Sequence, residues 1–214
     1  MEAHKIQNLN LFSKASRYGL TLAALALLVL AVGCGSQGGA NLDSQIAVAE
    51  ASEQAVRDLD WAAYAKLLHP DELASTRQML MPGIDAVSPP TDSLTETDTI
   101  GFFGAQFNAL QMRTAEDEEF FAVLMDGLFA STPDLQVSFR GMTSHAVGAV
   151  AEGDTLVHVV MRSQMRIQMR DVDEVMITTL RKYGDEWRVE FSTQVEGIIF
   201  TLHQGVMQMT QRRP

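Results

Sequence analysis

Hydrophobic and polar positions recur with two different periods along this chain, which separates a helical part from a strand part. In residues 61–69 the apolar side chains fall at i, i+3, i+4 and i+7, the spacing of one helix face. After Pro133 the spacing changes to the alternation typical of strands. We therefore expect helices first and a β-sheet second.

Capping residues and helix breakers predict where the first helices lie. Asp60 is a suitable cap for a helix, and Pro70 suits the first turn of the next one. The Pro82-Gly83 pair is expected to end that helix and open a long loop over 83–99. Three helices are predicted, at residues 44–59, 61–69 and 70–81.

The middle of the chain gives a less uniform pattern. Residues 100–107 form a short apolar element whose type the pattern does not decide. A capping box from Thr114 to Asp117 predicts the start of a further helix, whose first turn is acidic. Residues 134–142 fit either an irregular lead-in or an additional strand.

The segment MRSQMRIQMR, residues 161–170, can be read in two ways. On a helix it would be basic and amphipathic, whereas on a strand its methionines would face one side and its arginines the other. The alternation continues from Val157 without a breaker, and the preceding residues are β-branched. We therefore predict a strand, with Met161 and Met165 on the core face.

Turn signals then define the sheet. Gly153-Asp154 and Gly184-Asp185 each separate two strand-like runs, which predicts two hairpins in an antiparallel meander. From Gly197 onward the apolar positions return to helical spacing. The predicted fold class is α+β, with N-terminal helices on a curved antiparallel sheet and a C-terminal helix.

The N-terminus has the composition of a targeting segment. Three basic residues precede an uncharged apolar run over 20–32, which is too short to span a bilayer. The run ends in Ala31-Val32-Gly33-Cys34, which resembles a bacterial lipobox, although the lipobox prefers Leu where Ala31 stands. We expect a signal peptide over 1–33, a linker over 34–43 and one domain over 44–214.

The lipobox resemblance implies that Cys34 is the lipid attachment site. Cys34 is the only cysteine, so it has no partner for an internal disulfide. Several acyl chains on one cysteine give stable membrane binding. The expected location is the bacterial cell envelope, through a lipid anchor. Gly35 is not the aspartate that favours inner-membrane retention, so the outer membrane is favoured where one exists.

Charge narrows the choice of partners. The full chain has a formal net charge of −11. Removal of 1–33 takes away three basic residues and one acidic residue, which leaves 13 basic against 26 acidic and a net charge of −13. Such a chain repels phosphate backbones, so we expect no nucleic-acid partner.

Residues 58–73, DLDWAAYAKLLHPDEL, resemble the helix pair of nuclear transport factor 2-like proteins. AEGDTLVHVVMRS and LRKYGDEWRV resemble their C-terminal strands, and the match over 45–202 is most similar to exported bacterial members. The resemblance implies a cone with an apolar pocket between sheet and helices. The family includes ketosteroid isomerases, SnoaL-type polyketide cyclases, dehydratases and non-catalytic binding modules, so membership alone selects no activity.

Candidate pocket residues follow from this cone. We expect the pocket to be lined by the following side chains: Trp61, Tyr64, His69, Met161, Met165 and Phe191. No spacing typical of a metal site, phosphate loop or Ser/His/Asp set occurs, so we predict no catalytic residue, metal or cofactor.

The favoured function is a membrane-anchored, non-catalytic module that binds a small apolar ligand or an envelope protein. The sheet is the surface expected to form any homodimer. The alternative is a small cofactor-independent enzyme of the SnoaL or ketosteroid isomerase type.

Overall fold

The computed structural model describes residues 42–90, 93–167 and 170–211. The predicted signal peptide, Cys34 and most of the linker lie outside the described residues. The side chains of 165–167 and 170 are also outside the described residues. The structure therefore shows that Met165 is in a strand, and the predicted core-facing side chain of Met165 lies outside the description.

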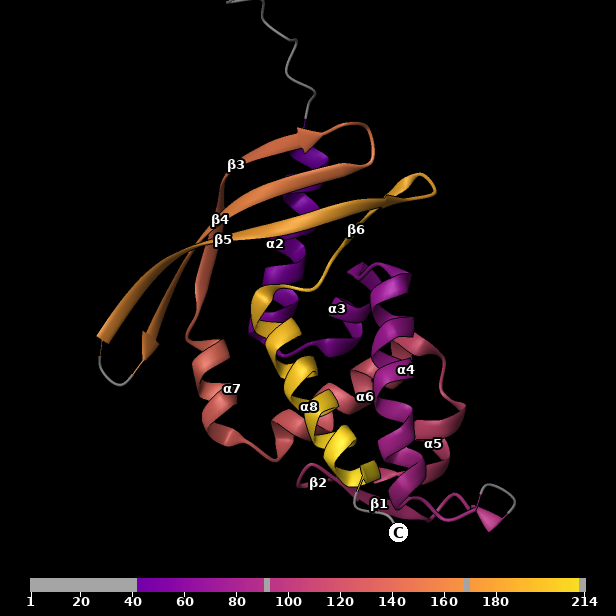
Figure 1. The fold of residues 1–214 in the computed structure, drawn as a ribbon. Coiled ribbons are helices and arrows are strands. Elements are labelled where there is room, and N and C mark those ends of the chain that lie inside the picture. The colour runs from indigo at the N-terminus through magenta and orange to yellow at the C-terminus, as the bar shows by residue number, and fades with distance from the viewer. Residues whose placement is uncertain (1–41, 91–92, 168–169, 212–214) are drawn as a thin grey trace, which may run out of the picture. The chain divides into compact units, whose positions relative to one another are not determined.

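The described elements form an α+β fold, as the sequence predicted (Figure 1). The helices are α2 Asp43–Asp58, α3 Trp61–Leu67, α4 Pro70–Val87, α5 Ala109–Thr114, α6 Asp117–Ala130, α7 Pro133–Arg140 and α8 Thr193–Gln211. The strands are β1 Thr99–Phe102, β2 Ala105–Asn108, β3 Thr143–Glu152, β4 Leu156–Ile167, β5 Arg170–Tyr183 and β6 Glu186–Val189. β1 and β2, which cover the undecided segment 100–107, pair as a small hairpin.

The larger sheet is an antiparallel meander in the order β3-β4-β5-β6. Gly153 and Gly184 turn its outer hairpins with φ of 68° and 60°, a conformation that glycine adopts without steric cost. The predicted hairpins at these glycines are confirmed. The register of β3 against β4 shifts between Ala146 and Gly148, which marks a β-bulge at Val147.

Side-chain burial on β4 confirms the strand interpretation of its sequence. Val157, Val159, Met161 and Ser163 are at most 1% exposed, whereas the Arg162 side chain between them is 51% exposed. Arg162 pairs with Asp173 on β5. β5 separates β4 from β6, so Glu186 and Glu190 at the β6 side are not cross-strand partners of the β4 arginines.

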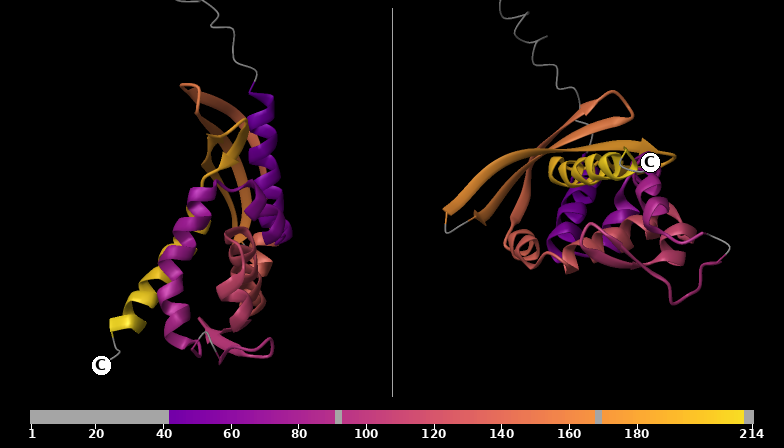
Figure 2. Two further views of the ribbon diagram at one scale, coloured as in Figure 1. Left: turned by 90° about the vertical axis from the view of Figure 1, so that its right-hand side faces the viewer. Right: turned by 60° about the horizontal axis from the view of Figure 1, so that its bottom comes forward.

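The apolar core has two parts. In one, α2 lies along the inner face of the larger sheet, where Ala49 packs with Val157, Val159 and Met161 (Figure 2). In the other, α3, α4, α6 and α8 pack mainly against one another. Within the described ranges, no helix has the length and apolar character needed to cross a membrane.

The expected end of a helix at Pro82-Gly83 is wrong, because α4 continues to Val87 with Pro82 inside it. Gly83 and Ile84 are buried, and Gly83 lies against Val206 of α8 and Phe102 of β1. Tertiary packing of this last turn therefore outweighs the local preference of the proline to end the helix.

Other boundaries also differ from the sequence prediction. Residues 133–140 form α7, a helix, where the sequence had suggested an irregular lead-in or a strand. The capping box is wrong, because the Thr114 hydroxyl donates to Leu110 O at the end of α5. The C-terminal helix begins at Thr193, four residues before Gly197.

Candidate functional site

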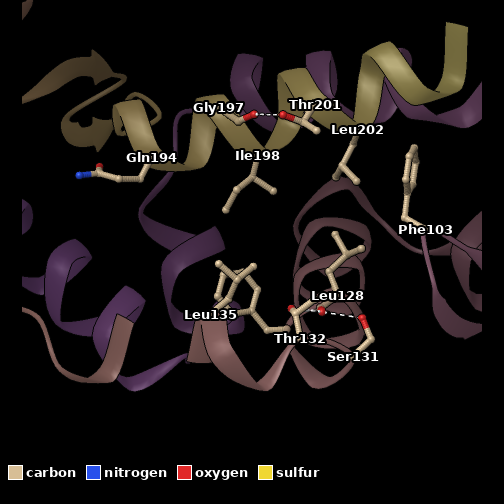
Figure 3. Close-up of a pocket in the computed structure, with 11 residues that line it drawn as sticks. Phe103, Leu128, Ser131, Thr132, Leu135, Gln194, Gly197, Ile198, Thr201 and Leu202 are labelled. Carbon is tan, nitrogen blue, oxygen red and sulfur yellow. Dashed lines mark hydrogen bonds between the residues drawn. The ribbon is translucent and has the colours of Figure 1, made fainter. Parts of the chain in front are cut away.

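An apolar pocket of about 430 Å³ opens between the end of α6, the start of α7 and the first half of α8 (Figure 3). Its size falls in the range of sites that hold small ligands. The lining residues are Phe103, Leu128, Phe129, Ser131, Thr132, Leu135, Gln194, Gly197, Ile198, Thr201 and Leu202.

Helical spacing on α8 creates one wall of this pocket. Gly197, Ile198, Thr201 and Leu202 lie at i, i+1, i+4 and i+5, so they share one face of the helix. Gly197 has no side chain, and a Cβ placed there would meet no atom within 4 Å. The helix surface at Gly197 therefore leaves open space at the pocket.

The opposite wall comes from the end of α6 and its connection to α7. Phe129 is 3% exposed and Leu128 is 9% exposed, so they form an apolar floor. The hydroxyls of Ser131 and Thr132 both donate to Leu128 O, at 2.8 and 2.7 Å. The pocket is therefore lined by apolar side chains and neutral polar groups, with no ionisable side chain among the lining residues.

A second hollow of about 510 Å³ lies between the start of α2, the end of α3 and the β5–β6 turn. Its lining mixes both charges with apolar groups: Ser44, Val48, Lys66, Leu67, Asp185, Glu186, Trp187 and Arg188. Arg188 is engaged by Glu186 at 2.5 Å and by Lys66 O. This mixed lining favours the first pocket as the candidate site for an apolar ligand.

Of the predicted pocket residues whose side chains the structure describes, none lines either hollow, and Trp61 lies beside the first. Trp61 packs on Phe129 with ring centroids 4.7 Å apart, one aromatic ring behind the pocket wall. Phe191 stacks on Phe121 at 5.7 Å, and Tyr64 lies 6.0 Å from that same ring. Met161 lies elsewhere, in the core between α2 and the sheet.

Two buried titratable groups, Tyr64 and Glu53, lie near each other inside the molecule. The Tyr64 hydroxyl is fully buried beside Ser192, and burial raises the pKa of Tyr64 above its ordinary value. Glu53 of α2 is 5% exposed, and burial raises the pKa of its carboxyl. The helical period could have identified Glu53, because it shares the buried face of α2 with Ala49 and Val56.

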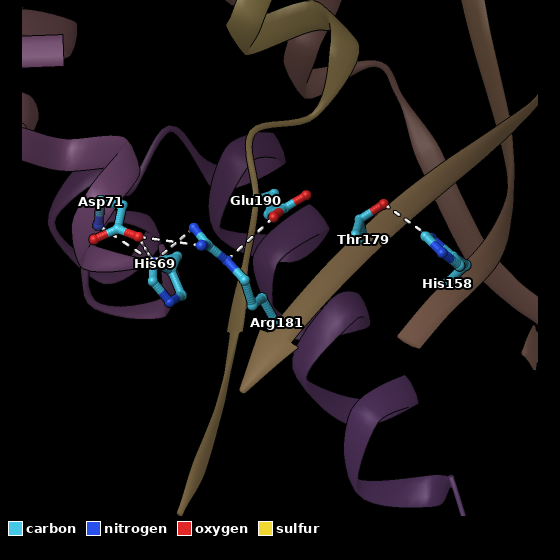
Figure 4. A network of polar contacts seen from close by, with 6 residues as sticks. All are labelled: His69, Asp71, His158, Thr179, Arg181 and Glu190. Atoms are coloured by element: carbon cyan, nitrogen blue, oxygen red, sulfur yellow. Dashed lines mark hydrogen bonds and ion pairs between the residues drawn. The ribbon is translucent and has the colours of Figure 1, made fainter. Parts of the chain in front are cut away.

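His69 lies at the start of α4 in a network of polar contacts (Figure 4). Its Nδ1 accepts from the Asp71 backbone N–H at 3.2 Å and lies 3.0 Å from Arg181 Nη2. Arg181 also pairs with Asp71 at 3.1 Å and with Glu190 at 3.2 Å. Because Nδ1 accepts from both donors, His69 acts here as a neutral cap of α4.

In the part of the chain that the structure describes, no group of three or more His, Cys, Asp or Glu side chains is arranged to hold a metal ion.

Comparison with known proteins gives one loose structural likeness. The fold is similar to an NTF-2-like protein of unknown function from Shewanella oneidensis MR-1, with 12% sequence identity and a TM-score of 0.37. The likeness covers 72% of this chain and 97% of that chain. No family model matches the sequence, and no curated protein matches it.

Proposed function

We propose that this chain is a lipid-anchored protein of the bacterial cell envelope whose domain binds a small apolar ligand without catalysis. The pocket between α6, α7 and α8 is the proposed binding site. The observation that carries the proposal is a lining of aliphatic, aromatic and neutral polar residues around a volume of about 430 Å³. The anchor rests on the sequence around Cys34.

The energetics of this pocket favour an apolar ligand. Each square ångström of apolar surface removed from water contributes roughly 25 cal/mol, so a ligand that covers the apolar side chains of both walls, such as Phe129 and Leu202, is stabilised by their burial. The neutral polar groups around it give orientation.

The alternative function is a small cofactor-independent enzyme. Proton transfer needs an acid or base within hydrogen-bond reach of the substrate. Glu53 and Tyr64 are buried groups with raised pKa values, but neither lines the pocket. Turnover of a ketosteroid or polyketide substrate that is lost in both Glu53→Gln and Tyr64→Phe, with the fold intact, would support the enzyme instead.

Binding can be measured with the neutral probe N-phenyl-1-naphthylamine, whose fluorescence rises in apolar surroundings. Gly197→Phe places an aromatic ring in the open space beside α8, where a Cβ meets no neighbour. We expect the full-length protein to bind the probe saturably and Gly197→Phe to lose that binding. Gln204→Phe is the matched control, since Gln204 is an exposed residue of the same helix outside the pocket lining.

Circular dichroism should show the same helix content for both variants. Equal probe binding by wild type and Gly197→Phe would place the binding site elsewhere and overturn the proposal. Loss of binding in Gln204→Phe as well would show that the helix surface as a whole, and not the pocket, holds the probe.

A further inference from the structure

We infer that the pocket selects apolar ligands that carry a hydrogen-bond donor, above all a protonated amine, and that it rejects carboxylates and phosphates. This inference rests on the proposed binding function and names the ligand class of the same site. Three features of the pocket lead to it: the use of its hydroxyl protons, the end of α6 and the surrounding charge.

The hydroxyl protons of the lining residues are already used within the protein. Ser131 and Thr132 donate to Leu128 O, and Thr201 donates to Gly197 O at 2.8 Å (Figure 3). A hydroxyl has one proton and two lone pairs, so each of these groups is left to accept hydrogen bonds. A ligand that offers N–H or O–H groups therefore matches the lining.

Gln194 adds a further acceptor at the α8 side. Its Nε2 donates to Met176 Sδ at 2.6 Å, which directs one amide N–H to strand β5. Its Oε1 and its second N–H remain for other partners. Gln194 is thus the one lining side chain with an N–H that is not yet used, and its Oε1 offers a hydrogen-bond acceptor next to that N–H.

The end of α6 brings partial negative charge to the pocket. Residues 128 and 129 are in the last turn of this 14-residue helix, and both line the pocket. The carbonyl end of a helix has partial negative charge, which a cation stabilises by roughly 0.3–1 kcal/mol. The last turn of α6 contains no basic residue, so its own sequence does not supply that cation.

The acidic residues near the pocket also favour a cation over an anion. Asp134 and Glu196 directly flank lining residues in the sequence, and the chain has a net charge of −11. The start of α7 offers little to an anion. Pro133 has no N–H, and the N–H groups of Leu135 and Gln136 both donate to Thr132 O.

Three probes with the same ten-carbon chain separate this inference from the proposed function: decylamine, decanol and decanoate. Isothermal titration calorimetry of the full-length protein at neutral pH gives the dissociation constant of each. We expect decylamine to bind tightest, decanol more weakly, and decanoate at least tenfold more weakly than the amine, which corresponds to about 1.4 kcal/mol.

A matched pair of variants tests the acceptor role of the lining. Thr201→Val removes the hydroxyl at the pocket and keeps the shape of the side chain. Thr210→Val makes the same change further along α8, where the hydroxyl donates to Val206 O outside the pocket. Thr201→Val should weaken decylamine binding several-fold. Thr210→Val should bind decylamine with the dissociation constant of the wild type.

The outcomes are distinguishable. If decanoate binds as tightly as decylamine, the ligand class is wrong while the apolar pocket stands. If none of the three probes binds, the proposed binding function fails and the inference fails with it. A fall in decylamine affinity that is equal in both threonine variants would contradict the role of the Thr201 oxygen.

Discussion

At the scale of single residues, His69 shows how one neutral ring can link two elements. Its Nδ1 accepts from the Asp71 backbone N–H and faces Arg181 of β5. Both interactions require that Nδ1 is unprotonated. Burial of the ring, and next the Arg181 guanidinium, lower the pKa of His69 below its ordinary value of 6.5.

The sign of the resulting pH dependence follows from linkage. The unfolded chain binds a proton near pH 6.5, whereas the folded chain resists it, so the contribution of His69 to stability is present above about pH 6.5 and is lost as the pH falls. His69→Asn keeps an acceptor for the cap but cannot titrate. In urea denaturation, the free energy of unfolding should fall more for wild type than for His69→Asn when the pH is lowered from about 7 to about 5.

His145→Asn is the control for this measurement, because His145 is exposed on β3. It should follow the wild-type profile. Identical pH profiles for wild type and His69→Asn would show that the ring does not cap α4 as a neutral acceptor.

Glu53 gives a prediction of opposite sign. Burial raises the pKa of this carboxyl above its ordinary value of 4.5, against the opposing effect of Ser144. The stability of wild type therefore falls as the pH rises from about 4.5 through the folded-state pKa, because a buried carboxyl must ionise. Glu53→Gln removes this loss, so its gain in unfolding free energy over wild type should be larger at about pH 8 than at about pH 5.

Glu50→Gln on the same helix is the matched variant, since Glu50 is exposed and its Oε1 accepts from Ala146 N. A gain that does not depend on pH in Glu53→Gln would mean that the carboxyl is already neutral or solvated throughout this range.

At the scale of elements, two helical glycines should respond to alanine with opposite signs. A Cβ on Gly83 of α4 would lie 2.6 Å from Val206 Cγ2 of α8, whereas a Cβ on Gly197 would meet nothing. Gly197→Ala should therefore raise the free energy of unfolding by roughly 0.5–1 kcal/mol. Gly83→Ala should lower it by about 1–3 kcal/mol through overpacking.

Urea denaturation monitored by circular dichroism measures both changes. If Gly83→Ala stabilises the protein as Gly197→Ala does, α4 and α8 are not in the close contact that the structure describes.

The same helices show which parts of the fold the sequence could predict. The alternation from Val157 was sufficient to predict strand β4 and its buried face, because side-chain direction on a strand is a local property. The continuation of α4 through Pro82 was not predictable, because it depends on Val206, more than one hundred residues away. Likewise, α7 is only eight residues long, and its apolar residues Leu135, Val137 and Phe139 alternate, so the pattern fits a strand as well as a helix.

The candidate pocket was less accessible to sequence analysis than the fold. Its walls come from Phe103, the 128–135 segment and the start of α8, which only packing brings together. Trp61 was expected to line a pocket, and the structure places it one ring behind the wall, on Phe129. An aromatic residue at helical spacing predicts burial, but it does not say which side of a core borders a cavity.

At the scale of the whole molecule, the first prediction concerns the membrane anchor. The apolar run over 20–32 ends in the lipobox-like Ala31-Val32-Gly33-Cys34, and we predict from it that the mature protein begins at a lipidated Cys34. Expression of the full chain in a bacterium with a clickable palmitate analogue should label wild type and leave Cys34→Ser unlabelled. Equal labelling of the two proteins would contradict the anchor.

The second prediction at this scale is self-association through the outer face of the larger sheet. Val150, Val175 and Ile177 on this face are 62%, 65% and 59% exposed. They lie close together on the sheet, because all three pair with neighbouring same-face positions of β4. Val150 of β3 pairs with His158, whereas Ile177 and Val175 of β5 pair with Val160 and Arg162. Burial of these β-branched side chains against a second copy would remove an exposed apolar patch from water.

The net charge of −11 opposes such a dimer, so we expect dimer formation to depend on the salt concentration. Screening weakens repulsion between like-charged copies, so the dimer fraction in sedimentation velocity should rise between about 0.05 M and about 0.5 M salt. Ile177→Lys should abolish the dimer, whereas Val137→Lys should retain it, because Val137 is equally apolar and 73% exposed but lies on α7. A monomer at every salt concentration, or the same loss of dimer in both lysine variants, would rule out the sheet as the interface.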